Sequence, residues 1–127
     1  MIKQLILVTL GGGVGSALRY LTSIWFIRYF PTAFPLGTFF INILGCLIIG
    51  FLLGLSNRYS ILDNELRFLL IVGFCGGYTT FSTFSSENVR LFENGNYWML
   101  ASYIAASVIL GFIAVWVGNF LSKIITQ

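Results

Sequence analysis

Long apolar stretches alternate with short polar ones along the whole chain, and four of the apolar stretches stand out by their length. They cover approximately residues 5–27, 36–55, 67–89 and 97–121. A helix needs about 20 mostly apolar residues to cross the hydrocarbon core of a membrane, and each stretch reaches that length. The pattern therefore predicts an all-α membrane protein in which residues 1–127 form one domain of four transmembrane helices.

Three short polar connections separate the predicted helices. Pro31 and Pro35 enclose the first one, and proline stops a helix because it lacks an amide donor and restricts the residue before it. Residues 56–65 form the most polar part of the chain and are expected to be a surface loop. Turn-forming residues at 93–96 precede the fourth helix. Connections this short leave no room for a soluble domain.

The third apolar stretch contains the pair Gly76 and Gly77, followed by a run of Thr, Ser and Phe. Glycine weakens a helix by about 1 kcal/mol relative to alanine, so we expect the helix to break in this region. Carbonyl groups freed at such a break are potential cation ligands, and the hydroxyl groups beyond it can line a polar path. Close packing of two helices at the glycine pair is the alternative interpretation.

Small and polar residues recur every fourth position in the second and fourth stretches and draw one stripe down each helix. The members are Thr38, Asn42, Cys46, Gly50 and Gly54 in the second stretch and Tyr103, Ser107 and Gly111 in the fourth. Such a stripe is either a contact face between helices or the wall of a pore. Asn42 accordingly has two interpretations, a hydrogen-bonding link between helices or an amide donor to an anion.

Two charged residues within the apolar stretches need a partner, because a charge inside a membrane is costly. Arg19 must snorkel toward the membrane surface, face water or bind acceptors such as carbonyls at a helix end. Glu87 lies three residues before Arg90, and an ion pair along the helix is the simplest explanation of that acid.

Composition supports a membrane protein and excludes several function classes. Hydrophobic residues make up 57% of the chain, charged residues only 9%, and the mean hydropathy is +0.92. The seven Lys and Arg residues are dispersed, which argues against a nucleic acid partner. Without histidine, a catalytic dyad or an acid at mid-membrane depth, the chain resembles neither an enzyme nor a proton-coupled antiporter. Cys46 and Cys75 lack metal-ligand spacing and are expected to be small buried side chains.

Three stretches of this sequence resemble the signatures of the Fluc (CrcB) fluoride channel family. They are GGGVGSALRY at residues 11–20, GTFFIN at 37–42 and GFCGGYTTFSTFSSE at 73–87. The resemblance covers all four spans in order. It implies an antiparallel, dual-topology homodimer within the lipid of a prokaryotic cytoplasmic (inner) membrane, exporting fluoride passively through two pores around a central structural sodium ion.

The resemblance also implies roles for individual residues. Phe81 and Phe84 match the pore phenylalanines, Asn42 the pore asparagine and Arg19 the arginine of the first span, with a structural or pore-mouth role. The polar track of the anion pathway is assigned to Ser82, Thr83, Tyr103, Ser107 and Thr38. Backbone carbonyls of Gly76 and Thr79 are assigned to sodium. Gly111 departs from relatives that have serine there, which makes that end of the track less polar.

Two other functions remain compatible with four apolar spans. One is a small four-span exchanger or exporter of the multidrug type, and the other is a membrane assembly subunit that conducts nothing. A measurement of fluoride and chloride efflux separates the three.

Overall fold

The computed structural model describes residues 1–58 and 64–125, and its secondary structure there is helical. The first, second and fourth spans are α1 (Ile2–Tyr29), α2 (Leu36–Arg58) and α6 (Tyr97–Ile125). The third is divided into α3 (Asn64–Leu66), the π-helix η1 (Arg67–Cys75), α4 (Gly76–Tyr78) and α5 (Phe81–Glu93). All four spans are long and apolar enough to cross a membrane, so the predicted all-α class and number of spans are confirmed.

The helices extend beyond the predicted apolar stretches at several ends. Amphipathic residues at the membrane surface continue the backbone hydrogen bonding of a helix although they lower its hydropathy. For this reason α6 continues to Ile125 and α1 to Tyr29. Helix also covers both ends of the expected surface loop, whose central residues, 59–63, lie outside the described residues.

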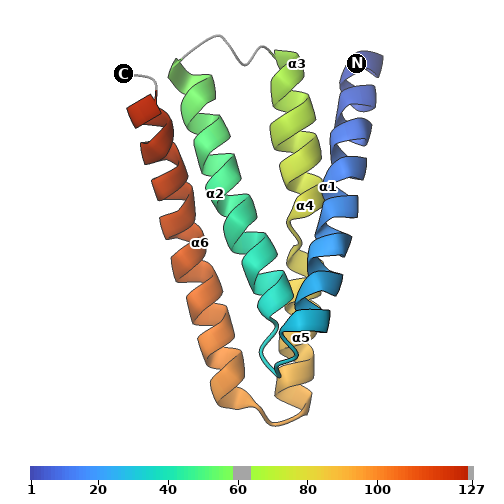
Figure 1. The fold of residues 1–127 in the computed structure, drawn as a ribbon, viewed down its shortest axis with the longest axis vertical. Helices are drawn as coiled ribbons and strands as arrows, with labels where there is room; N and C mark the ends of the chain where they lie inside the picture. The colour runs from blue at the N-terminus through green and yellow to red at the C-terminus, as the bar shows by residue number, and fades with distance from the viewer. Residues whose placement is uncertain (59–63, 126–127) are drawn as a thin grey trace.

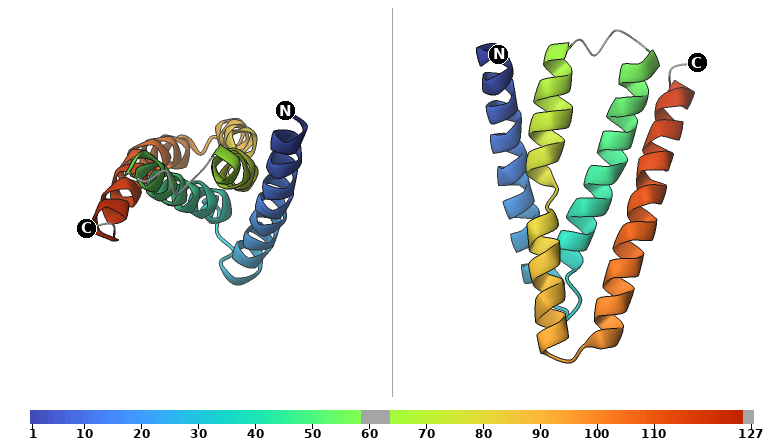
Figure 2. Two further views of the ribbon diagram at one scale, coloured as in Figure 1. Left: turned by 90° about the horizontal axis from the view of Figure 1, so that it is seen from above. Right: turned by 180° about the vertical axis from the view of Figure 1, so that it is seen from behind.

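The bundle consists of two helix pairs. In Figure 1, α2 runs along α6, while α1 runs along η1 and α4. The two pairs diverge toward the end that holds both termini, and the view from behind in Figure 2 shows the same divergence. At the opposite end α5 packs against α6 and, to a lesser extent, α2.

Glycines allow the helices within each pair to approach backbone to backbone. A Cβ atom on Gly15 of α1 would lie 2.3 Å from the Phe74 carbonyl oxygen in η1. On Gly77 of α4 it would lie 2.4 Å from the Gly12 carbonyl oxygen. Separations this short exclude any side chain, so both positions in this seam require glycine.

The other pair, α2 and α6, has the same kind of seam. A Cβ on Gly50 would lie 2.1 Å from the Val115 carbonyl oxygen, and one on Gly118 would lie 2.2 Å from that of Leu47. The C-terminal part of the predicted stripe in the second span is therefore a contact face.

The third span is interrupted two residues after the glycine pair. Gly76 and Gly77 are helical, whereas Thr79 (φ −79°, ψ 158°) and Thr80 (φ −150°, ψ 119°) are extended. An interruption is thus present in the expected stretch, but it lies at the two threonines, while Gly77 packs closely against α1. The β-branched threonines adopt the extended conformation, which suits their side chains.

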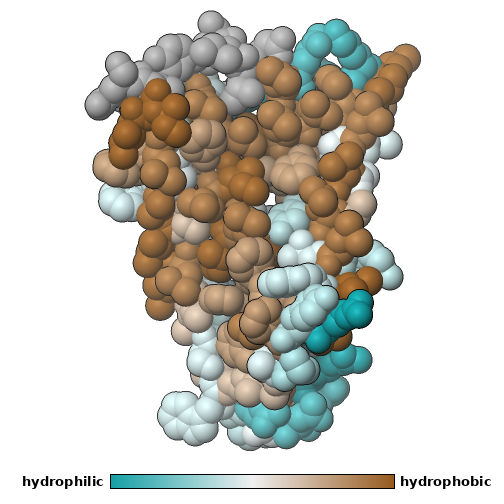
Figure 3. Space-filling view, in the orientation of Figure 1, coloured by the Kyte–Doolittle hydropathy of each residue, from teal (hydrophilic) through white to brown (hydrophobic). Residues whose placement is uncertain are grey.

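Much of the apolar surface of the chain is not covered by the chain itself. The largest fully buried side chains among the described residues are those of Tyr103, Ile41 and Ser122, while Trp98 is 91% exposed. Figure 3 shows apolar side chains over most of the visible face and hydrophilic ones toward the end that carries the α5–α6 connection. Lipid or another membrane protein must cover such a surface.

The seam between α2 and α6 predicts a difference between two glycines of α6. Gly118→Ala is expected to lower stability by about 1 to 3 kcal/mol, because its methyl group meets the Leu47 carbonyl oxygen. Gly111→Ala is the matched control, since its methyl group would lie at an ordinary 3.6 Å from Cys46 Sγ. Heating the detergent-solubilised protein and following its monodisperse fraction gives the midpoints. Equal midpoints in the two variants would contradict the close packing.

Candidate functional site

The interruption at Thr79 and Thr80 is held from one side by Asn42 of α2. Its Nδ2 donates to the Thr80 carbonyl at 3.0 Å, and its Oδ1 accepts from the Thr80 amide at 2.9 Å. The Asn42 carboxamide thus supplies the partner that the Thr80 amide lacks outside a helix, and it adds a second bond to the Thr80 carbonyl, which begins α5 as its N-cap. Because Thr80 is only 8% exposed, loss of Asn42 would leave a buried amide unpaired. Asn42 therefore links two helices, one of the two roles predicted for it.

Thr80 also begins α5. Its Oγ1 accepts from the Thr83 amide at 3.3 Å, the bond of a helix N-cap, and donates to Thr83 Oγ1 at 3.0 Å. The Ser82 hydroxyl lies 3.4 Å from the same oxygen. The direction of α5, and with it the position of Phe81, depends on this cap.

The first helix holds the same interruption from the other side. Arg19 Nη1 donates to the Thr79 carbonyl oxygen at 3.2 Å, and Ser16 Oγ donates to that of Gly77 at 3.4 Å. Of the three partners predicted for Arg19, the carbonyl at a helix end is the one present.

Phe81 and Phe84 lie one turn apart on α5, with ring centroids 5.9 Å apart. Phe81 is 79% exposed on the single chain. Phe84 faces inward, where its ring centroid lies 4.9 Å from that of the fully buried Tyr103. The pair therefore extends from the interior of the bundle to its uncovered surface.

A cavity of about 530 Å³ lies between α2, the third span and α6. It collects most of the residues that the sequence assigned to the anion pathway and to sodium, namely Asn42, Phe81, Phe84, Ser107, Gly76 and Thr79. Cys46 and Cys75 line it as well, and both are free thiols. The Ser107 hydroxyl is enclosed and has no hydrogen-bond partner within the described residues, so its hydrogen-bonding capacity is unused.

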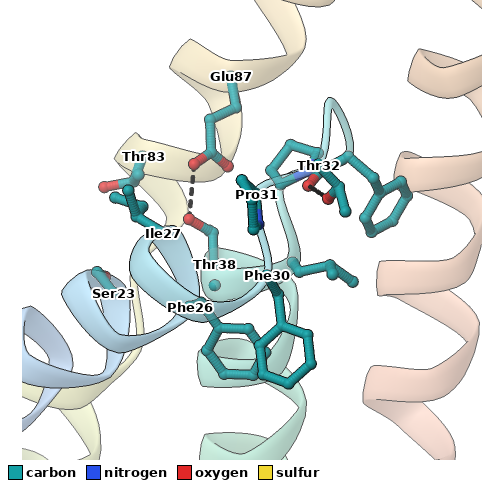
Figure 4. A pocket seen from close by; sticks show the side chains of 13 residues that line it. Ser23, Phe26, Ile27, Phe30, Pro31, Thr32, Thr38, Thr83 and Glu87 are labelled. Carbon is teal, nitrogen blue, oxygen red and sulfur yellow. Dashed lines mark hydrogen bonds between the residues drawn. The ribbon is translucent and has the colours of Figure 1, made fainter.

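A second cavity, of about 480 Å³, lies at the connection between α1 and α2. Glu87 reaches it from α5, and its two carboxylate oxygens accept from Thr38 Oγ1 at 2.7 Å and from Tyr103 Oη at 2.8 Å. Figure 4 shows the bond to Thr38, with Thr83 beside it. The predicted ion pair of Glu87 with Arg90 is wrong, because the carboxylate turns inward toward hydroxyl donors.

The assigned pathway residues thus fall into two adjoining groups. Asn42, Phe81, Phe84 and Ser107 line the first cavity, and Thr38 and Thr83 line the second. Tyr103 connects them, because its ring contacts Phe84 and its hydroxyl donates to Glu87. Ser82 is exposed in the first turn of α5.

Sequence reasoning missed two functional positions in this region. Thr80 bonds both Asn42 and Thr83, and a threonine just before an amphipathic segment was a signal for the helix cap. For Glu87 the sequence suggests only an ion pair with Arg90 along the helix. No local signal connects it to Thr38 and Tyr103, since both bonds depend on how the helices pack.

Comparison with known proteins gives the family. The sequence model of the family described as "CrcB-like protein, Camphor Resistance (CrcB)" matches residues 6–119. A protein of Azobacteroides pseudotrichonymphae named "Fluoride-specific ion channel FluC" is 46% identical over 123 residues, which are 97% of this chain and 98% of the relative. The chain belongs to the CrcB-like family. A relative of the same name in Phocaeicola vulgatus is 48% identical to this CrcB-like protein over 95% of the chain and 99% of the relative. Another in Flavobacterium psychrophilum is 45% identical over 95% of the chain and 98% of the relative.

The contacts of Asn42 in this CrcB-like protein predict a stability effect. Asn42→Ala is expected to lower the free energy of unfolding by about 1 to 3 kcal/mol, because the buried Thr80 amide is left unpaired. Asn57→Ala, at an exposed position near the end of α2, is the control and should change stability little. Thermal midpoints in detergent measure both effects. A midpoint for Asn42→Ala equal to that of the Asn57 control would show that Asn42 does not hold the interruption.

Proposed function

We propose that this chain is a fluoride-selective channel through which fluoride leaves the cell passively. The observation that carries the proposal is the near full-length identity of 45% to 48% with proteins named fluoride-specific ion channels. Those names describe channels and not enzymes. The four apolar spans agree with a multi-pass membrane protein of this kind.

The chemistry of the first cavity suits a small, strongly hydrated anion. Fluoride gives up water only in exchange for other hydrogen-bond donors, and hydroxyl and amide groups donate without placing a fixed charge in the path. Asn42 uses one Nδ2 hydrogen for Thr80, which leaves its second for an anion. The enclosed Ser107 hydroxyl is a further donor. The edges of Phe81 and Phe84 carry partial positive charge and add weak attraction.

The assembly we propose is an antiparallel homodimer with one pore on each side of its two-fold axis. Phe81 and Gly76 line the first cavity and are exposed on the single chain, so a second copy placed there would complete the wall. Two copies related by a two-fold axis bury the same face on each and close the assembly. Small residues on that face permit close approach within the membrane.

A sodium ion on the two-fold axis is the third part of the proposal. The residues fit a monovalent cation. Thr79 is extended, so its carbonyl lies outside the helical ladder, and no atom from elsewhere in the described chain lies within 4 Å of where a Gly76 side chain would begin. Among the described residues no group of three or more His, Cys, Asp or Glu forms a metal site. Backbone carbonyls of Gly76 and Thr79 from two copies would hold the ion, which would relieve the repulsion between converging carbonyl dipoles.

Purified protein reconstituted in liposomes tests the channel. We expect rapid fluoride efflux, recorded with a fluoride electrode, while chloride is retained. Efflux that requires a proton gradient would instead indicate an exchanger, and absence of efflux an assembly subunit.

Replacement of either pathway phenylalanine should remove most of this flux. Phe81→Ile and Phe84→Ile take away the ring edges that line the cavity, so we expect flux to fall at least tenfold, equivalent to about 1.4 kcal/mol of barrier. Phe92→Ile is the matched control, since Phe92 belongs to the same helix but does not line the cavity. Full flux in both pathway variants would exclude the rings from the path.

The small difference in basic residues between the two ends of the helix bundle predicts insertion in both orientations. By the bounds of their helices, the end of the bundle with the termini carries four basic residues and the opposite end two, which is a weak bias. The four are Lys3, Arg58, Arg67 and Lys123, and the two are Arg28 and Arg90. Gln4→Cys, in a chain with Cys46 and Cys75 replaced by alanine and with flux retained, should react with an impermeant maleimide in about half of the copies from each side. Labelling from one side alone would refute dual topology.

A further inference from the structure

We propose that Arg19 is a tethered cation that shares the Thr79 carbonyl oxygen with the sodium ion and thereby weakens the dependence of the protein on sodium. This inference rests on the sodium site of the proposed function. Arg19 is a positioning residue here and not a ligand of the ion.

The first step is the contact itself. Arg19 Nη1 lies 3.2 Å from the carbonyl oxygen of Thr79, one of the two carbonyls assigned to sodium. A carbonyl oxygen has two lone pairs, so one is taken by the guanidinium and one is left for an ion. A guanidinium keeps its charge at any working pH.

The packing of α1 prevents Arg19 from withdrawing easily. One turn before it, a Cβ on Gly15 would lie 2.8 Å from the Tyr78 amide nitrogen, so the α1 backbone is in close contact with the residue that precedes Thr79. Thr22, three residues after Arg19, lies with its hydroxyl 3.3 Å from Tyr78 Oη. Contacts on both sides of Arg19 therefore hold its helix against the interruption.

Two effects of this contact act in the same direction. The guanidinium satisfies the Thr79 carbonyl without sodium, which lowers the cost of the ion-free state. It also places a positive charge on an oxygen that a second cation would use, and like charges at such short range repel strongly outside bulk water. Both effects reduce the affinity for sodium, so a neutral side chain at this position should raise it.

Sodium titration of thermal stability tests the inference. The midpoint of the solubilised dimer is measured against sodium concentration at constant ionic strength, with N-methyl-D-glucamine as the replacement cation. Arg19→Gln keeps an N–H donor and removes the charge, and we expect its half-saturating sodium concentration to fall about tenfold below that of the unchanged chain. Arg19→Met removes both the charge and the donor, and its half-saturating sodium concentration should also fall. Arg19→Lys, which keeps the charge, should shift less than either.

Arg28→Gln is the matched control, because Arg28 lies near the end of α1 over the ring of Tyr29 and away from the interruption. An unchanged half-saturating concentration in Arg19→Gln, with or without a lower midpoint, would overturn the inference and leave Arg19 a purely structural residue. A higher concentration would also overturn it, since Arg19 would then help to organise the oxygens. If sodium changes the midpoint of no chain, the sodium site fails together with this inference, while fluoride efflux decides the channel separately.

Discussion

The fold depends on the satisfaction of a few backbone groups at the interruption of the third span. At the interruption the Thr79 carbonyl and the Thr80 amide lack helical partners, and a low-dielectric interior does not tolerate such groups unpaired. Asn42 accepts from the Thr80 amide and also donates to the Thr80 carbonyl, and Arg19 donates to the Thr79 carbonyl. Helices from both pairs therefore converge on two residues, and these contacts fix the start of α5, which carries Phe81 and Phe84.

The apolar pattern was sufficient for the spans because burial in lipid is the dominant requirement on each of them. It placed the second span at 36–55, where α2 covers Leu36–Arg58. The position of the interruption was not predictable in the same way. Glycine pairs suit a helix break and a close helix contact equally well, and Gly77 serves the contact because Gly12 of another helix lies opposite it. The nine-residue π-helix that precedes it has no signal in the sequence.

For the polar side chains, the sequence indicated which residues matter but not which residues they bond. The stripe on the second span pointed to Thr38 and Asn42, yet it did not say that Thr38 meets Glu87 or that Asn42 meets Thr80. Bonds between residues 38 to 49 positions apart depend on packing that only the folded chain defines. The resemblance to a family supplied roles for these residues, and the structure supplies the bonds that constrain them.

The two glycine seams make each helix pair more rigid than the contact between the pairs. Within each helix pair, backbones touch at glycines and leave almost no freedom to move apart or slide. Between the pairs lie the first cavity and hydrogen bonds such as those of Asn42, which are fewer and can lengthen. Lateral pressure from the surrounding lipid would therefore change the spacing between the pairs before it changes the spacing within either, so the width of the first cavity is the dimension of this protein most sensitive to its membrane.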